Sequence, residues 1–214
     1  MQHGFELARR LVETLPSGSE GLFNPWRDVC QLQSQGNDAE SRLCRLGLHL
    51  SVDPDFILVG EAPGYAGCRY SGVAFTSERL LLEGAIPRIP PPATRLCERA
   101  TPFSEPSATI VWKTLYRIGI ENRVILWNAL QMHPHHPGEP WSNRTPRDDE
   151  IAMGRPALQM LTAAFPRASI IAVGRKAQSL LDVSGIRADA AIRHPANGGA
   201  TAFAEGLSLA VAAH

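Results

Sequence analysis

Short apolar runs alternate along the chain with longer stretches of helical periodicity. Four of these runs have strand character: residues 56–59, 123–127, 169–173 and 190–193. Runs of this length that are apolar at successive positions are typical of strands buried on both faces, as in a parallel sheet. Each run is followed by glycine or a polar residue, which favours a turn at the carboxyl end of the strand.

The stretches between and after the runs predict helices. The first, at residues 106–118, has an apolar face that includes Val111 and Leu115. The second begins at a cluster of acidic residues, 148–150, which favours a helix N-terminus. Two more are expected at 176–181 and 202–212. The second helix is expected to extend to residue 165. Strands that alternate with helices predict an α/β fold of three layers, α/β/α, with a central four-stranded parallel sheet.

The length of 214 residues suits a single domain, 1–214. Residues 1–50 are helical and irregular in pattern, and we expect them to cover the sheet. Residues 55–200 form the core of the predicted fold. Two loops rich in proline, at 87–106 and 133–146, are expected on the surface at one end of the sheet.

Composition changes this picture little. Lysine and arginine number 21 and so do aspartate and glutamate, which argues against a strongly basic coat but leaves room for a local basic crevice. No apolar run has the ~18 residues that span a bilayer, and the N-terminal residues do not resemble a secretion signal. The four cysteines are far apart, as in reduced thiols. We therefore expect a cytoplasmic monomer with no membrane contact.

Candidate chemistry gathers where the predicted strands end. Gly60-Glu-Ala-Pro-Gly64 is a sharp turn that exposes backbone amides and one carboxylate, although a plain strand–helix turn has the same composition. Asn128 ends the next strand, and its amide can donate and accept at once, matching N3–H and O4 of uracil while rejecting cytosine. A role in capping a neighbouring loop is the alternative for Asn128.

An aromatic ring and an imidazole complete the set. Phe75 follows a glycine turn and is suited to stack on a flat base, although a core position is the alternative. His194 stands at the end of the last strand, where its ring can hydrogen-bond an oxygen that gains negative charge. The other interpretation of His194 is a simple turn before Pro195.

In combination these pieces resemble the uracil-DNA glycosylase superfamily. The resemblance covers most of residues 55–200 and implies that fold, DNA containing uracil as partner, and hydrolysis of the N-glycosidic bond of deoxyuridine. It implies that Phe75 stacks on uracil, Asn128 reads its edge and His194 stabilises the leaving anion. Gly60 and Ala62 would bind the base through the backbone. The matching segments are Gly60-Glu-Ala-Pro-Gly64 with Gly72, Ala74 and Phe75, then Leu126-Trp-Asn-Ala129, Val173-Gly-Arg-Lys-Ala177 and His194-Pro-Ala196.

The sequence also departs from the family pattern. The water-positioning aspartate of the first-described branch is replaced by Ala62, and the tyrosine that blocks thymine's methyl group is replaced by Gly64. The first motif looks like that of the iron–sulfur branch, in which the glutamate matching Glu61 has the acidic role. That branch binds a 4Fe–4S cluster through cysteines that begin with a close pair. Such a pair is missing here, so we expect neither a cluster nor another cofactor.

The resemblance further implies contacts with DNA. The loop of Pro195, Ala196 and Asn197 would enter the gap left by the flipped base, and Arg193 and Lys176 would contact phosphates. A solvated surface charge is the alternative for each basic residue.

Three other functions stay open. One is release of another deaminated base such as hypoxanthine, for which Gly64 leaves room. The protein can instead be a DNA-damage binder of the same fold that does not turn over. A metal-binding module built on His133, His135 and His136 is the third, although the neighbouring prolines restrict their convergence.

Overall fold

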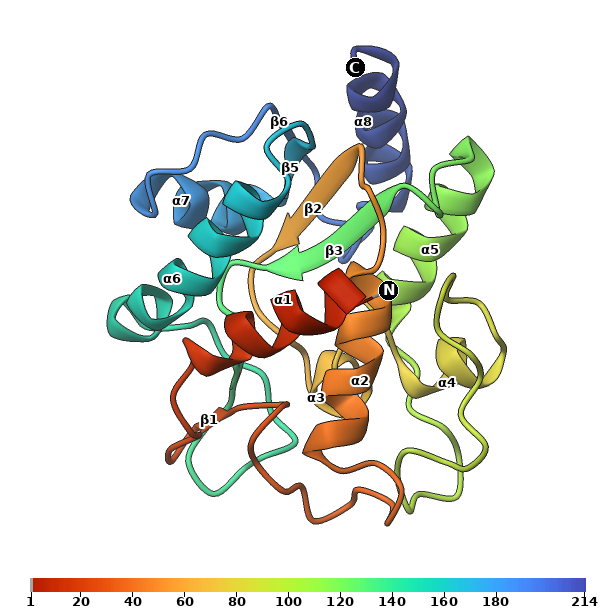
Figure 1. Ribbon diagram of the computed structural model, residues 1–214, viewed down its shortest axis with the longest axis vertical. Helices are drawn as coiled ribbons and strands as arrows, with labels where there is room; N and C mark the ends of the chain where they lie inside the picture. The colour runs from red at the N-terminus through yellow and green to blue at the C-terminus, as the bar shows by residue number, and fades with distance from the viewer. Residues whose placement is uncertain (1) are drawn as a thin grey trace.

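A four-stranded parallel sheet forms the centre of the computed structural model, which describes residues 2–214 (Figure 1). The strand order is β3-β2-β5-β6, with β2 and β5 in the interior. The bounds are Phe56–Gly60 for β2, Val124–Asn128 for β3, Ser169–Val173 for β5 and Ala190–Ile192 for β6. Each predicted strand is confirmed to within one residue at either end. Both faces of this sheet are covered by helices, and strands in such a sheet are apolar at successive positions, as these four are.

Helices surround the sheet. Those predicted from periodicity are α5 (Pro106–Ile118), α6 (Asp148–Ala164), α7 (Arg175–Val183) and α8 (Ala200–Ala212), all confirmed within two residues. The others are α1 (Gln2–Glu13), α2 (Ala39–Leu50) and the short α3 (Cys68–Ser71) and α4 (Glu78–Leu82). A small antiparallel pair joins β1 (Leu22–Phe23) to β4 (His133–Pro134). Among the described residues, no helix is long and apolar enough to cross a bilayer.

Alternate residues of β2 separate the two sides of the core. Phe56 and Leu58 pack with side chains of α5 and α8 on one face of the sheet. Ile57 and Val59 pack with α1, α2, α6 and α7 on the other face. This alternation produces the three-layer α/β/α arrangement that the sequence predicts, as Figure 1 shows.

Two buried arginines connect the N-terminal segment to the rest of the chain. The Arg42 guanidinium donates to the carbonyl oxygens of Pro25, Asn37 and Asp28. Arg45 donates from Nε to the Ser71 carbonyl at 2.7 Å. Burial lowers the pKa of both guanidinium groups to about 10, so both stay charged at neutral pH. These bonds fix the loop before α2 against the segment that follows β2. The single-domain organisation stays a prediction.

The long connection between α4 and α5 is partly buried, unlike the surface loop that its proline content indicates. Leu96, Cys97 and Phe103 all lie in the interior. The Glu78 carboxylate, fully buried, accepts from the backbone amides of Leu96 and Phe103 at 2.8 and 2.9 Å. The Cys97 thiol donates to the same carboxylate at 2.9 Å, and Arg95 pairs with it at 2.7 Å. A single buried carboxylate therefore organises this loop.

Replacing Glu78 by glutamine is expected to lower the free energy of unfolding by roughly 3 kcal/mol, because the amide nitrogen cannot accept the bonds that converge there. Burial opposes ionisation of Glu78, but the bonds from Arg95, Cys97, Phe103 and Leu96 outweigh it and lower its pKa. A lowered pKa stabilises the fold above the ordinary glutamate pKa, and this stabilisation is lost as pH falls through the lowered value.

Urea unfolding at pH 7 and at several pH values below about 4.3, the ordinary glutamate pKa, measures both effects. Wild type should lose more stability than Glu78→Gln as the pH falls. Glu98→Gln, an exposed change in the same loop, is the matched control. Equal stability of Glu78→Gln and wild type at pH 7 would contradict the prediction.

Candidate active site

The carboxyl ends of the four strands meet at one pocket of about 680 Å³. Gly60 of β2 lies opposite Asn128 of β3 in the parallel register, and the ladder continues as the Ala129 amide donates to the Gly60 carbonyl at 2.9 Å. On the other side the Gly174 amide donates to the Ile192 carbonyl at 2.8 Å, which brings the end of β6 to the end of β5. The lining includes Glu61, Ala62, Phe75, Asn128, Lys176, His194, Ala196 and Asn197.

Phe75 lies directly on the backbone of Gly60. A Cβ atom at position 60 would approach the Phe75 ring to 2.6 Å and Asn128 Oδ1 to 2.8 Å, so only glycine fits. Phe75 has a φ of 48°, a left-handed conformation that is uncommon for a bulky residue. Trp112 Nε1 donates to the backbone carbonyl of Phe75 at 2.9 Å, and this bond holds the left-handed conformation. The ring of Phe75 is thereby fixed as one wall of the pocket.

Asn128 is 5% exposed, yet its side-chain amide has no protein partner among the described residues. The backbone carbonyl of Asn128 is engaged by Gln131 Nε2 at 2.7 Å, which holds the strand end. A nearly buried amide without a partner is costly unless a ligand or water satisfies it. Its place on the pocket wall beside Phe75 leaves the amide open to a ligand, and its base-reading role stays a prediction.

The imidazole of His194 has a defined tautomer. The Ala196 amide donates to Nδ1 at 3.1 Å, so the neutral ring carries its proton on Nε2. Burial lowers the pKa of His194, and the neighbouring Arg193 lowers it further, which favours this neutral form. The ring lies 6.2 Å from that of Phe75, centroid to centroid. His194 therefore presents an N–H donor, with no partner among the described residues, to the pocket.

Glu61 is paired. Lys176 Nζ lies 3.3 Å from its Oε1 and donates to Thr145 Oγ1 at 2.7 Å. The pair is partly exposed, so it fixes the direction of the carboxylate more than it stabilises the fold. Lys176, expected at a DNA phosphate, thus lies in the pocket wall on Glu61.

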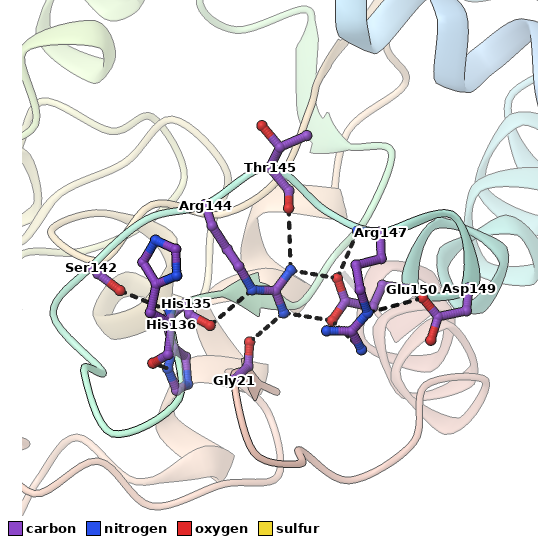
Figure 2. Close-up of polar contacts among 9 residues, drawn as sticks. All are labelled: Gly21, His135, His136, Ser142, Arg144, Thr145, Arg147, Asp149 and Glu150. Carbon is purple, nitrogen blue, oxygen red and sulfur yellow. Dashed lines mark hydrogen bonds and ion pairs between the residues drawn. The ribbon is translucent and has the colours of Figure 1, made fainter.

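The loop between β4 and α6 forms the wall next to Glu61, and Arg144 holds it. Figure 2 shows the Arg144 guanidinium between the Glu150 carboxylate and the carbonyl oxygens of Gly21 and His135. Its two terminal nitrogens, Nη1 and Nη2, donate to the Glu150 carboxylate at 2.7 and 2.6 Å. Glu150 is almost fully buried. This bidentate pair fixes Thr145 at the pocket. The sequence does not reveal this role of Arg144, because it also depends on the Gly21 carbonyl, far away in the chain.

Another loop residue, Asn143, is held from the opposite side. Arg69 Nη1 donates to His133 Nδ1 at 2.9 Å, so the proton of His133 is on Nε2, which donates to Asn143 Oδ1 at 3.1 Å. The same oxygen accepts from the Tyr65 amide at 2.8 Å. Burial lowers the pKa of His133 to about 3, and Arg69 contributes. Both ring nitrogens of His133 are engaged, which argues against the metal-binding alternative.

The comparisons with known proteins agree with this geometry. The family model described as the uracil DNA glycosylase superfamily matches residues 49–204, most of the chain. The chain belongs to this superfamily. No curated protein sequence matches it. Among solved structures, the crystal structure of wild-type SMUG2 from Pedobacter heparinus matches with a TM-score of 0.64 at 11% identity, over 97% of this chain and 97% of that chain. The match to SMUG2 shows a shared fold.

The four thiols do not fit the 4Fe–4S cluster that the iron–sulfur branch of the glycosylase superfamily binds. Cys97 donates to Glu78, and the Sγ of Cys30 lies 3.0 Å from the Tyr70 hydroxyl. Cys68 is buried and Cys44 is exposed. Among residues 2–214, no three His, Cys, Asp or Glu side chains gather as a ligand set. The three buried cysteines are therefore engaged in packing and hydrogen bonding.

The loop after His194, which the glycosylase resemblance assigns to the DNA gap, divides into two parts. Pro195 is buried, while Asn197 is exposed with a φ of 52°. Ala196 and Asn197 line the pocket, and Arg193 is exposed at the end of β6. The structure brings Glu61, Ala62, Phe75, Asn128 and His194 together around one pocket, with Gly60 beneath Phe75. Contact with DNA stays a prediction for all five residues named for it: Arg193, Pro195, Ala196, Asn197 and Lys176.

Proposed function

We propose that this superfamily member hydrolyses the N-glycosidic bond of deoxyuridine in DNA, releasing uracil and leaving an abasic site. The observation that supports this proposal best is the pair of unpartnered polar groups beside Phe75: the Asn128 amide, open to the pocket, and the Nε2–H of His194. An amide that donates and accepts matches N3–H and O4 of uracil. A neutral imidazole N–H is the donor needed at a second carbonyl oxygen.

The reaction follows from these groups. Uracil turned out of the stack would lie on Phe75, with its edge on Asn128. As the N1–C1′ bond breaks, both bonding electrons leave with the base, and negative charge grows on its oxygens. The His194 Nε2–H, aimed at such an oxygen, stabilises this charge, commonly a large part of catalysis. Water adds hydroxide to C1′, and its proton is accepted by the leaving base. Glu61, oriented by Lys176, would position the water or stabilise the cationic sugar.

DNA is the partner in this proposal, and the compartment is the cytoplasm, at the nucleoid when on DNA. Arg193 would contact a phosphate, and Asn197 would enter the gap beside the flipped base. Lys176 pairs with Glu61 at 3.3 Å while its side chain stays 59% exposed, so in this proposal it would contact a phosphate from the pocket rim. Two other functions in the same pocket are release of hypoxanthine and binding of damaged DNA without turnover. Gly64 favours the former because a Cβ atom there would have no neighbour closer than 3.7 Å.

A base-release assay tests the proposal. End-labelled oligonucleotides with uracil opposite guanine, opposite adenine and unpaired are incubated with the protein and then cleaved with alkali at abasic sites. We expect cleavage at uracil, and thymine in the same position measures whether the methyl group is excluded without the tyrosine that Gly64 replaces. DNA that is bound but never cleaved would overturn the hydrolase in favour of the binder. Cleavage at hypoxanthine alone would overturn uracil as the substrate.

A further inference from the structure

Glu105 belongs to none of the motifs above, yet its carboxyl lines the same pocket. It precedes α5 and reaches the far end of the turn that begins at Gly60. A Cβ atom on Gly67 would lie 1.9 Å from Glu105 Oε2, so the carboxyl occupies the space beside this glycine. A Cβ atom on Gly64 would lie 3.7 Å from Oε1. Asn128 therefore marks the Gly60 end of the turn, and Glu105 marks the Gly64 end.

The carboxyl of Glu105 has no hydrogen bond or ion pair with any described residue. The residue as a whole is partly exposed, but burial of the carboxyl raises its pKa to about 7. The titratable neighbour is the Cys68 thiol, itself buried, whose pKa is raised by burial and by Glu105. Within residues 2–214, no basic side chain compensates the carboxyl. A carboxyl that lines a ligand pocket and has no protein partner indicates a group that the ligand satisfies.

We propose that Glu105 contacts the flipped base at its edge toward Gly64 and adapts the pocket to a deaminated purine such as hypoxanthine. With its pKa raised to about 7, the Glu105 carboxyl holds a proton in a large share of the molecules at neutral pH, and in that form it donates through O–H to an acceptor on the base. In a purine with a carbonyl at C6, the neighbouring acceptor on the same edge is N7. At the corresponding place uracil has only C5–H, and thymine has a methyl group.

The geometry of the turn supports this assignment. Asn128 would hold O6 and N1–H of hypoxanthine, the same acceptor and donor pair that it would hold in uracil. The adjoining edge of the base then faces the Gly64 end, where N7 meets Glu105. The absence of a side chain on Gly64 leaves space for the second ring. A bond from Glu105 to N7 also withdraws charge from the purine as its bond to C1′ breaks.

This inference rests on the proposed function, and one assay separates the two. Single-turnover rates of base release are measured for hypoxanthine opposite thymine and for uracil opposite guanine, with wild type and Glu105→Ala. We expect wild type to release both bases. The hypoxanthine-to-uracil rate ratio should fall on the order of tenfold or more in Glu105→Ala, because N7 loses its donor. Glu105→Gln is nearly isosteric and retains an N–H donor, so it should restore part of the ratio.

Glu98→Gln, an exposed change in the preceding loop, should leave the ratio unchanged. A ratio in Glu105→Ala within threefold of wild type would overturn the inference. Wild type that releases uracil but no hypoxanthine would overturn it too, while the proposed function stands. Wild type that releases neither base would overturn both. Release of hypoxanthine alone, lost in Glu105→Ala and recovered in part in Glu105→Gln, would support Glu105 and overturn uracil as the substrate.

Discussion

Alanine at Asn128 is expected to lower the rate of uracil release by about a hundred- to a thousandfold. The side-chain amide is nearly buried and has no protein partner among the described residues, so its hydrogen bonds are available to the base. Removing it leaves N3–H and O4 of a bound uracil unpaired inside the pocket, which costs much more than losing the same bonds in water. The measurement is the single-turnover rate on uracil opposite guanine at saturating protein.

Asn122→Ala is the matched control for this prediction. Asn122 is an exposed asparagine two residues before β3, the strand that Asn128 ends, and its carbonyl is unchanged by the substitution. The Asn122→Ala protein should release uracil at the wild-type rate. Thermal unfolding of Asn128→Ala should stay close to wild type, because the amide makes no bond to the described part of the protein. An Asn128→Ala protein that is folded and within threefold of wild-type activity would refute the base-reading role.

The second large effect is expected at His194. Replacing it by alanine should lower the rate of release by roughly a hundredfold or more, because the Nε2–H that faces the developing anion is lost. Alanine also removes the acceptor of the Ala196 amide, which changes the loop. His194→Asn separates the two effects. Its Oδ1 takes the place of Nδ1 and can accept from Ala196, while its Nδ2 takes the place of Cδ2 and does not extend to the position of Nε2.

Both His194 variants should therefore be strongly impaired, and His136→Ala, an exposed histidine of the β4–α6 loop, should not be. Binding to DNA that contains a non-hydrolysable deoxyuridine analogue should be little changed in His194→Asn, because the donor acts mainly on the departing anion. If His194→Asn releases uracil at the wild-type rate, the role of His194 is to hold the loop at Ala196.

The sheet and the strand-end residues could be predicted because local signals determine them. The run of Phe56–Gly60 is apolar at every position, so its place in a doubly covered sheet is predictable, and Asn128 follows from where the next strand ends. The parallel register then places Gly60 beside Asn128 without further information. The sequence predicts a stacking role for Phe75, and the structure places Phe75 in the pocket wall, but its left-handed backbone depends on the bond from Trp112, distant in the chain.

Residues positioned by tertiary contacts alone escaped the sequence analysis. Glu105 reaches the pocket only because Gly67, distant in the chain, leaves space for its carboxyl. Arg144 has no motif, and its role depends on Glu150, on the His135 carbonyl of its own loop and on the Gly21 carbonyl, distant in the chain. The proline content of the loop before α5 indicated a surface position. Part of this loop is buried instead, because the backbone amides of Leu96 and Phe103 bond the buried Glu78 carboxylate. A buried carboxylate must be satisfied by whichever donors the chain offers.

Two glycines of one turn face different evolutionary constraints. At position 60 any side chain collides with Phe75 and Asn128, so a substitution damages the chemistry itself. At position 64 a Cβ atom would have no neighbour closer than 3.7 Å, so small side chains fit. Mutation at position 64 can therefore change the depth of the pocket without displacing Asn128 or His194. Under the proposed function, the range of bases accepted by this scaffold can thus evolve through single substitutions at position 64 while Asn128 and His194 stay in place.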